Sequence, residues 1–198
     1  MPDFEAKVGR QALDAGVSGP IRQSVTGDMV IEQGGKYAEA TLAGRMFSVA
    51  NQAKVGTTSA LTTTWEGLAI CNPTGSGVQM KIVKFGYGLE IASDVAGAIG
   101  LMMAATTTLT TNLLVPVNRL TGGVASVALA SGGHTIATPV LWDVVGSYGT
   151  VATSATSVVF TTYELDGSLI LQPGNTLCTY NTLATTDCFV FSFLWEEV

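Results

Sequence analysis

The chain has 198 residues, of which 47% are apolar and only 12% are charged, and its formal net charge is −6. The nine Lys and Arg residues form no run, which argues against a phosphate-tracking groove for nucleic acid, although folding can still gather a small basic patch. The charged fraction is about half the ~25% usual for globular domains. We therefore expect much of the surface to be buried against other subunits.

The first 40 residues differ from the rest because they mix charged, glycine and polar residues with little periodicity. They lack the apolar stretch of a signal peptide, and only residues 28–32 resemble a short strand. We interpret residues 1–40 as an extended arm that orders on a neighbouring molecule, with a flexible leader as the alternative. The candidate interface residues of this arm are Ile21, Arg22, Val25, Met29 and Ile31.

Residues 64–89 carry the clearest local pattern, in which two apolar, aromatic-containing stretches flank the turn segment NPTGSG. Pro73 fixes its own φ, while Gly75 and Gly77 permit positive φ. This pattern predicts an antiparallel hairpin. In its second arm the alternation changes phase at Ile82 and Val83, which indicates a bulge or a strand that moves from one sheet to the other.

Other strands are expected on both sides of this segment. A short strand at residues 44–51 precedes it, followed by a loop rich in Thr and Ser. Residues 98–105 are predicted as a strand, with a short helix as the alternative. Pro116 marks its segment as a sheet edge or a connection. The glycine-rich region that follows contains one predicted strand, at residues 140–145.

The C-terminal region alternates strands and turns. Residues 157–165 and 168–181 are predicted strands separated by a turn at Asp166 and Gly167, with a second turn at Pro173. The last segment shows the cleanest alternation in the chain, and this predicts a strand in the middle of a sheet. The aromatic face of that strand carries Phe189, Phe191, Phe193 and Trp195.

About eight strands with glycine-rich turns and almost no helix predict an all-β fold. Long early connections followed by tight C-terminal turns favour a jelly-roll-like antiparallel β-sandwich over residues 41–198. No fixed-period repeat argues for a propeller or solenoid. No apolar run approaches the ~20 residues that span a bilayer, so we expect no membrane partner.

The residues with reactive side chains give weak signals. The cysteines, Cys71, Cys178 and Cys188, are interpreted as small buried hydrophobic residues, with a Cys178–Cys188 disulfide as the alternative. The single histidine, His134, is expected to be a solvated loop residue, because one histidine cannot build a cupin-type metal site. Ser76 lies between two glycines, but the segment lacks the ending of a phosphate-binding loop.

Carboxylates leave a glycosidase as the least favoured hypothesis, because a pair of them in a cleft is enough for that chemistry. The candidates are Glu66, Glu164, Asp166, Glu196 and Glu197. We instead interpret the last two as charges that blunt a sheet end, and Asp166 as part of a turn. We expect no enzyme activity, catalytic residue, metal or cofactor.

Three segments resemble virion proteins of tailed bacteriophages, and the resemblance covers roughly residues 44–198. The segments are TWEGLAICNPTGSGVQMKIVKFGYG, LILQPGNTL and FSFLWEE. The resemblance implies a jelly-roll cement or decoration protein that forms a homotrimer, binds the major capsid protein and belongs to a virion assembled in the host cytoplasm. Such a protein stabilises the shell by bridging capsomers through many weak contacts.

The alternative role is a structural protein of the tail, or a tail module that binds carbohydrate or a receptor. In that role Trp65, Tyr148 and Tyr180 would stack on sugars if they were exposed. Their placement at or near predicted strands favours burial instead.

Overall fold

The computed structural model describes residues 35–90, 95–149 and 160–198. The chain divides into two units, Met1–Glu39 and Ala40–Val198. The five candidate interface residues of the arm, and the strand predicted at residues 28–32, lie outside the described residues and remain predictions. One short helix, α1 (Ala38–Leu42), crosses the boundary between the two units.

In the described residues of the second unit, the regular secondary structure is almost entirely β-strand, as predicted. In chain order they are β1 (Met46–Ala50), β2 (Val55–Thr57), β3 (Thr64–Asn72), β4 (Met80–Leu89), β5 (Gly97–Ala104), β6 (Leu113–Leu114), β7 (Val117–Asn118), β8 (Leu129–Thr135), β9 (Val140–Tyr148), β10 (Phe160–Leu171), β11 (Asn175–Asn181) and β12 (Thr185–Glu197).

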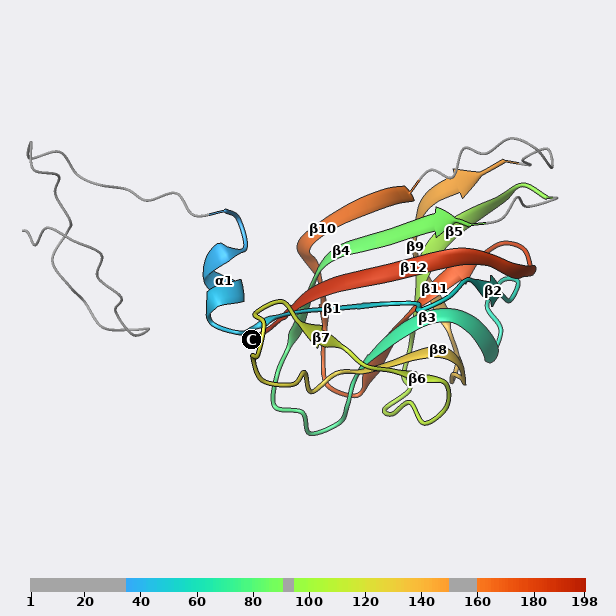
Figure 1. Ribbon diagram of the computed structural model, residues 1–198. Helices are drawn as coiled ribbons and strands as arrows, with labels where there is room; N and C mark the ends of the chain where they lie inside the picture. The colour runs from blue at the N-terminus through green and yellow to red at the C-terminus, as the bar shows by residue number, and fades with distance from the viewer. Residues whose placement is uncertain (1–34, 91–94, 150–159) are drawn as a thin grey trace, which may run out of the picture. The chain divides into compact units, whose positions relative to one another are not determined.

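These strands form two antiparallel sheets that face each other (Figure 1). Sheet I has the order β10-β4-β12-β1-β7, and β2 pairs with the beginning of β12. Sheet II has the order β6-β8-β3-β11-β5-β9. One edge of the sandwich is therefore formed by β7 and β6, and the opposite edge by β10 and β9.

The pairing follows the path of one long hairpin rolled into a sandwich. The first strand pairs with the last (β1 with β12), and the next pairs are β3 with β11, β4 with β10, and β5 with β9. Successive strands of this nested set change sheet at every step except from β5 to β9. This nested order is a jelly roll, which confirms the predicted fold class.

The core lies between the two sheets and is centred on β12. The aromatic face of β12 is buried, as predicted. β12 lies between β4 and β1 in the middle of sheet I, and its rings pack in a core cluster with residues of both sheets. The rings of Phe189 and Phe191 stack at 5.4 Å between centroids, and those of Phe85 and Phe193 lie 5.1 Å apart. Each buried ring contributes about 1.5–3 kcal/mol relative to an exposed one.

The hairpin predicted over residues 64–89 is wrong, because β3 and β4 belong to different sheets. The connecting turn crosses the sandwich, whose sheets are ~10 Å apart. Asn72 anchors it by donating side-chain hydrogen bonds to the carbonyls of Val78 and Leu171, and Ser76 donates one to the Asn72 side chain. An apolar–turn–apolar pattern identifies two strands but not the strands with which they pair.

The predicted bulge in β4 is confirmed. Both neighbours of β4 change register between Lys84 and Ile82, which leaves Val83 without an opposite residue. The turn predicted at Asp166 and Gly167 does not reverse the chain. It is a bulge of four residues within β10, opposite Val83, where Asp166 and Gly167 adopt positive φ.

Residues 105–139 form an insertion between β5 and β9 that extends both sheets. Pro116 separates β6, at the edge of sheet II, from β7, at the edge of sheet I, as predicted. Strand β8 was not predicted, because its sequence LASGGHT has the composition of a loop. It forms a strand because it pairs with β3, and this placement corrects the assignment of His134 to a loop.

Candidate interaction surfaces

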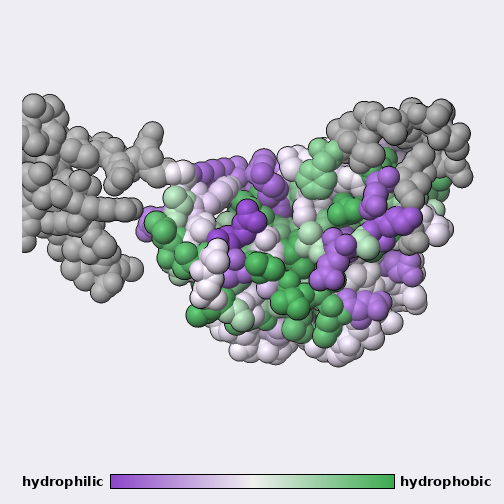
Figure 2. Space-filling model, viewed as in Figure 1, coloured by the Kyte–Doolittle hydropathy of each residue, from purple (hydrophilic) through white to green (hydrophobic). Residues whose placement is uncertain are grey.

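Exposed apolar side chains concentrate at the two edges of the sandwich. Of the sixteen large apolar residues that are exposed in the described part of the chain, five lie in the insertion and six on β9 and β10. The insertion contributes Leu113, Val115, Val117, Val124 and Val127, and the opposite edge Val140, Leu141, Trp142, Val144, Phe160 and Ile170. In the view of Figure 2, apolar residues gather over β7 and β6.

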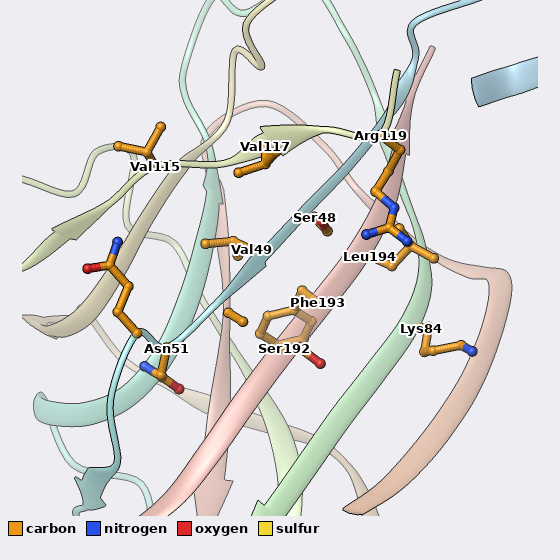
Figure 3. Close-up of a pocket in the computed structure, with 12 residues that line it drawn as sticks. Ser48, Val49, Asn51, Lys84, Val115, Val117, Arg119, Ser192, Phe193 and Leu194 are labelled. Atoms are coloured by element: carbon orange, nitrogen blue, oxygen red, sulfur yellow. The ribbon is translucent and has the colours of Figure 1, made fainter. Parts of the chain in front are cut away.

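The insertion edge borders an open groove of about 620 Å³ on the outer face of sheet I. Val115 and Val117 form one wall, and small residues of β1 and β12, including Ser48 and Ser192, line the floor (Figure 3). Because Ser48, Ala50 and Ser192 are short outward-facing side chains, the sheet face is hollow beside the larger Leu194. Opposite Ser192, β4 has Gly86, whose backbone is overlaid by the ring of Phe160.

One end of this groove is cationic. Figure 3 shows Arg119 and Lys84 at that end and Asn51 at the other. Lys84 is already paired with Glu164, with 2.7 Å between nitrogen and oxygen. Arg119 is exposed and has no ion-pair partner within the described ranges, so its charge is available to a molecule that enters the groove.

The opposite edge projects rather than recedes. Val140, Leu141 and Trp142 are all exposed. The register with β5 shifts at this point and leaves Trp142 without an opposite residue, so the regular alternation of faces is interrupted. The described residues therefore leave part of each of these three side chains uncovered. Within those residues β9 pairs only with β5, so its outer side is an open sheet edge.

Asp143 supplies the charge on this projecting edge. Its carboxylate accepts hydrogen bonds from the Val144 amide at 2.8 Å and from the Tyr163 hydroxyl of β10 at 3.0 Å. The hydrogen bond and the nearby negative charge raise the pKa of Tyr163. No Lys or Arg in the described part of the chain forms an ion pair with Asp143.

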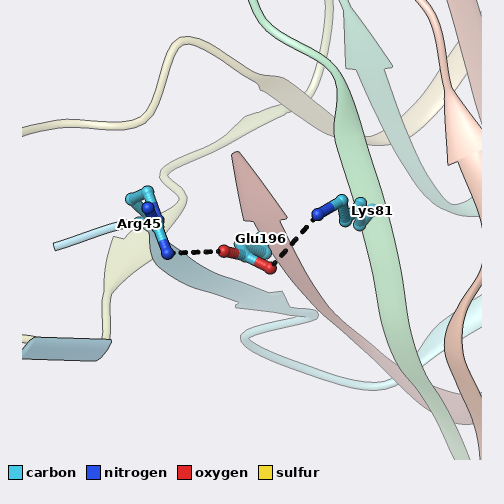
Figure 4. A network of polar contacts seen from close by, with 3 residues as sticks. All are labelled: Arg45, Lys81 and Glu196. Atoms are coloured by element: carbon cyan, nitrogen blue, oxygen red, sulfur yellow. Dashed lines mark ion pairs between the residues drawn. The ribbon is translucent and has the colours of Figure 1, made fainter. Parts of the chain in front are cut away.

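Three charged residues form a network of ion pairs at the end of sheet I where β12 ends. Glu196 of β12 binds Arg45 at 3.1 Å and Lys81 of β4 at 3.9 Å (Figure 4). Such partly exposed pairs contribute about 0–1 kcal/mol each. Glu197 differs from the predicted role of a charge that blunts a sheet end, because it is buried and accepts hydrogen bonds from Ser126 and the indole of Trp195.

The other residues singled out in the sequence have structural roles. His134 is half-buried in β8, and its Nδ1 lies 3.0 Å from the Thr111 hydroxyl. It borders a shallow hollow of about 600 Å³ lined mainly by threonines. Within the described ranges, no cluster of three or more His, Cys, Asp or Glu residues has the arrangement of a metal site.

The cysteines are buried, as predicted, and the alternative Cys178–Cys188 disulfide is not formed. Burial, followed by the effect of nearby Cys71, raises the pKa of the Cys178 thiol far above its ordinary value. The Cys188 thiol donates a hydrogen bond to the carbonyl of Thr186 at 3.0 Å. These thiols act as small core residues.

Two of the three aromatic residues considered for sugar stacking are buried. The Trp65 indole donates to the carbonyl of Thr179 at 2.7 Å, and the Tyr148 hydroxyl donates to the side chain of Asn181 at 3.0 Å. Tyr180 is half-buried. Sequence reasoning did not single out Trp142, which is exposed; the non-alternating apolar run VLWDVV was the available signal.

Comparison with known proteins identifies no relative. No protein-family model matches the chain, and no curated protein matches it significantly. In the described residues, no helix has the length and apolar character that crossing a membrane requires.

Proposed function

We propose that this chain is a structural subunit of a tailed-bacteriophage virion, which acts as a cement or decoration protein on the capsid. The observation that carries the proposal is the pair of apolar edges, because exposed apolar patches of this kind are typical of protein–protein contacts. The low charged fraction and the resemblance of three segments to phage virion proteins support it.

Stabilisation of a shell by such a subunit works through burial. Each copy covers apolar area on its sister copies and on the shell proteins, and a molecule that binds the assembled state alone shifts the equilibrium toward that state. Many weak contacts per copy add through multivalency. In this proposal the subunit is a homotrimer, and the arm of residues 1–40 contacts the major capsid protein.

A cryo-EM map of the virion of the phage that encodes this chain tests the proposal. We expect jelly-roll density where several capsomers meet, in groups of three. Density confined to the tail would overturn the cement role and leave the tail role. An otherwise complete virion without this chain would remove both.

The arm is tested separately by binding of the full chain to shells assembled without it. We expect the substitutions Met29→Asp and Ile31→Asp to weaken shell binding while leaving the sandwich folded. Val30→Asp serves as the matched control, because a strand places its side chain on the opposite face from Met29 and Ile31. Equal effects of all three substitutions would contradict a one-sided arm contact.

A further inference from the structure

We infer that the two apolar edges are the two halves of one head-to-tail interface between copies of this chain, in which the projecting β9 edge of one copy enters the groove beneath Val115 and Val117 of the next. This inference rests on the proposed self-assembly. It adds the surfaces that meet and the symmetry that they impose.

The positions of the two edges favour a head-to-tail arrangement. The β7 and β6 edge and the β10 and β9 edge lie on opposite sides of the sandwich. A two-fold dimer brings one patch against itself and would leave the other patch exposed. A head-to-tail contact uses both patches in every copy, and repeated around a closed ring it leaves neither exposed.

The shapes of the two edges also differ in a complementary way. The insertion edge is hollow, with a groove of about 620 Å³ over short side chains. The β9 edge projects, with Val140, Leu141 and Trp142 exposed in sequence. Large apolar side chains, Trp above all, that fill a pocket in the partner are typical centres of protein interfaces. An open β9 edge can also pair with the same edge of another copy across a two-fold axis, and the cross-linking test below separates that contact from the head-to-tail one.

Charge complementarity fixes the orientation. Arg119 lies at one end of the groove, and Asp143 is adjacent to Trp142 on the projecting edge. Neither charge is balanced by an ion pair within the described residues. When Trp142 is placed among the valines of the groove, Asp143 can face Arg119, and opposite charges across an interface favour one register over others.

Cysteine cross-linking of the full chain distinguishes this contact from a two-fold one. Val117 and Val140 are suitable positions because their exposed fractions are similar, at 60% and 65%. The native thiols are buried, with Cys71 and Cys178 at 0% and Cys188 at 7%. The variants are Val117→Cys, Val140→Cys, their equimolar mixture and the double variant, each oxidised and separated on a denaturing gel without reductant.

The mixture is expected to give a cross-linked dimer, and each single variant alone should remain uncross-linked. The double variant should give covalent oligomers up to the closed ring, which is a trimer in the proposed function. Cross-linking of either single variant as strongly as the mixture would show a two-fold contact and overturn the inference. An oligomer whose mixture does not cross-link would also overturn it.

A charge exchange provides an independent readout by light scattering across a dilution series. Arg119→Asp and Asp143→Arg are each expected to weaken association about tenfold or more, and the double exchange should restore much of it. Tyr163→Phe is the control for the hydrogen bond that Asp143 accepts, and it should leave association nearly unchanged. Failure of the double exchange to restore association would overturn the pairing of these two charges.

The outcomes separate this inference from the proposed function. A chain that is monomeric at every concentration would remove the head-to-tail contact while leaving shell binding to be measured by itself. An oligomer that follows the cross-linking pattern, yet is absent from the capsid in the virion map, would support the contact and contradict the cement role.

Discussion

Strands β12 and β9 both carry large apolar side chains, but the sandwich treats them in opposite ways. β12 lies in the middle of sheet I, and Phe191, Phe193 and Trp195 are at most 1% exposed. β9 lies at the edge of sheet II, where Val140 is 65% exposed and Trp142 is 37% exposed. Composition alone does not separate a core strand from a contact strand.

The difference lies in the pattern of the two sequences. Strict alternation in β12 places all its aromatic rings on one face, which one opposing sheet can cover. The run VLWDVV in β9 does not alternate, its register with β5 is interrupted at Trp142, and its own sandwich covers only part of its apolar side chains. An apolar strand without alternation at a sheet edge therefore indicates a surface for a second molecule.

Removing one aromatic ring from β12 and one from β9 should give the largest difference in the free energy of unfolding. Phe191→Ala should lower the free energy of unfolding by about 3–5 kcal/mol, because it opens a cavity between stacked rings. Trp142→Ala should cost the single sandwich clearly less stability, because Trp142 is 37% exposed to solvent, while it weakens self-association. Urea unfolding at low protein concentration measures the first quantity, and light scattering the second.

Equal losses of stability in these two variants would contradict the distinction between a core strand and a contact strand. Phe193→Leu is a milder control in the same core, since it keeps most of the apolar volume. We expect its cost to be well below that of Phe191→Ala.

Substitution of Gly100, where the register between β5 and β9 shifts, should give the next largest loss of stability. A Cβ at Gly100 would overlap the backbone carbonyl of Asp143 and lie 3.3 Å from the Cα of Val144. Gly100→Ala should therefore displace β9 and cost about 1–3 kcal/mol by overpacking. Gly132→Ala in β8 is the matched control, because its Cβ would meet no atom closer than 3.9 Å. Similar losses in both variants would show that β9 is not held close at this point.

Local patterns in the sequence predicted the features that depend on local chemistry. The aromatic alternation of β12, the bulge at Val83 and the edge position of Pro116 each follow from a few adjacent residues. The density of strands predicted an all-β fold, and the long early connections followed by tight C-terminal turns favoured a jelly roll.

Features that depend on distant partners were missed. β3 and β4 look like a hairpin because pairing with β11 and β12 leaves no mark in their own residues. β8 has the composition of a loop, and its pairing with β3 makes it a strand. The groove wall at Val117 likewise forms only because the insertion returns to the β1 edge. The candidate site was therefore less predictable than the fold.

Glu196 and Glu197, which end β12, should also differ in their contributions to stability, because Glu197 is buried and Glu196 is partly exposed. Glu197→Ala should cost about 1–3 kcal/mol, because it leaves the buried Trp195 indole without an acceptor and releases Ser126. Glu196→Ala should cost no more than about 1 kcal/mol, since its ion pairs are partly exposed. Chemical denaturation of both variants measures the difference. A larger loss for Glu196→Ala would contradict the assigned roles.

The smallest effect concerns the hydrogen bond that ties β9 to β10. The bond to Asp143 and its negative charge raise the pKa of Tyr163, so the folded state favours the protonated phenol. This contribution to stability is complete below the ordinary tyrosine pKa of about 10 and is lost as the pH rises through the raised value. Phenolate absorbance measures the titration, and subtracting the curve of Tyr163→Phe isolates this residue among the five tyrosines. Asp143→Asn should move the isolated curve to lower pH; an unchanged curve would show that Asp143 does not hold β9 against β10.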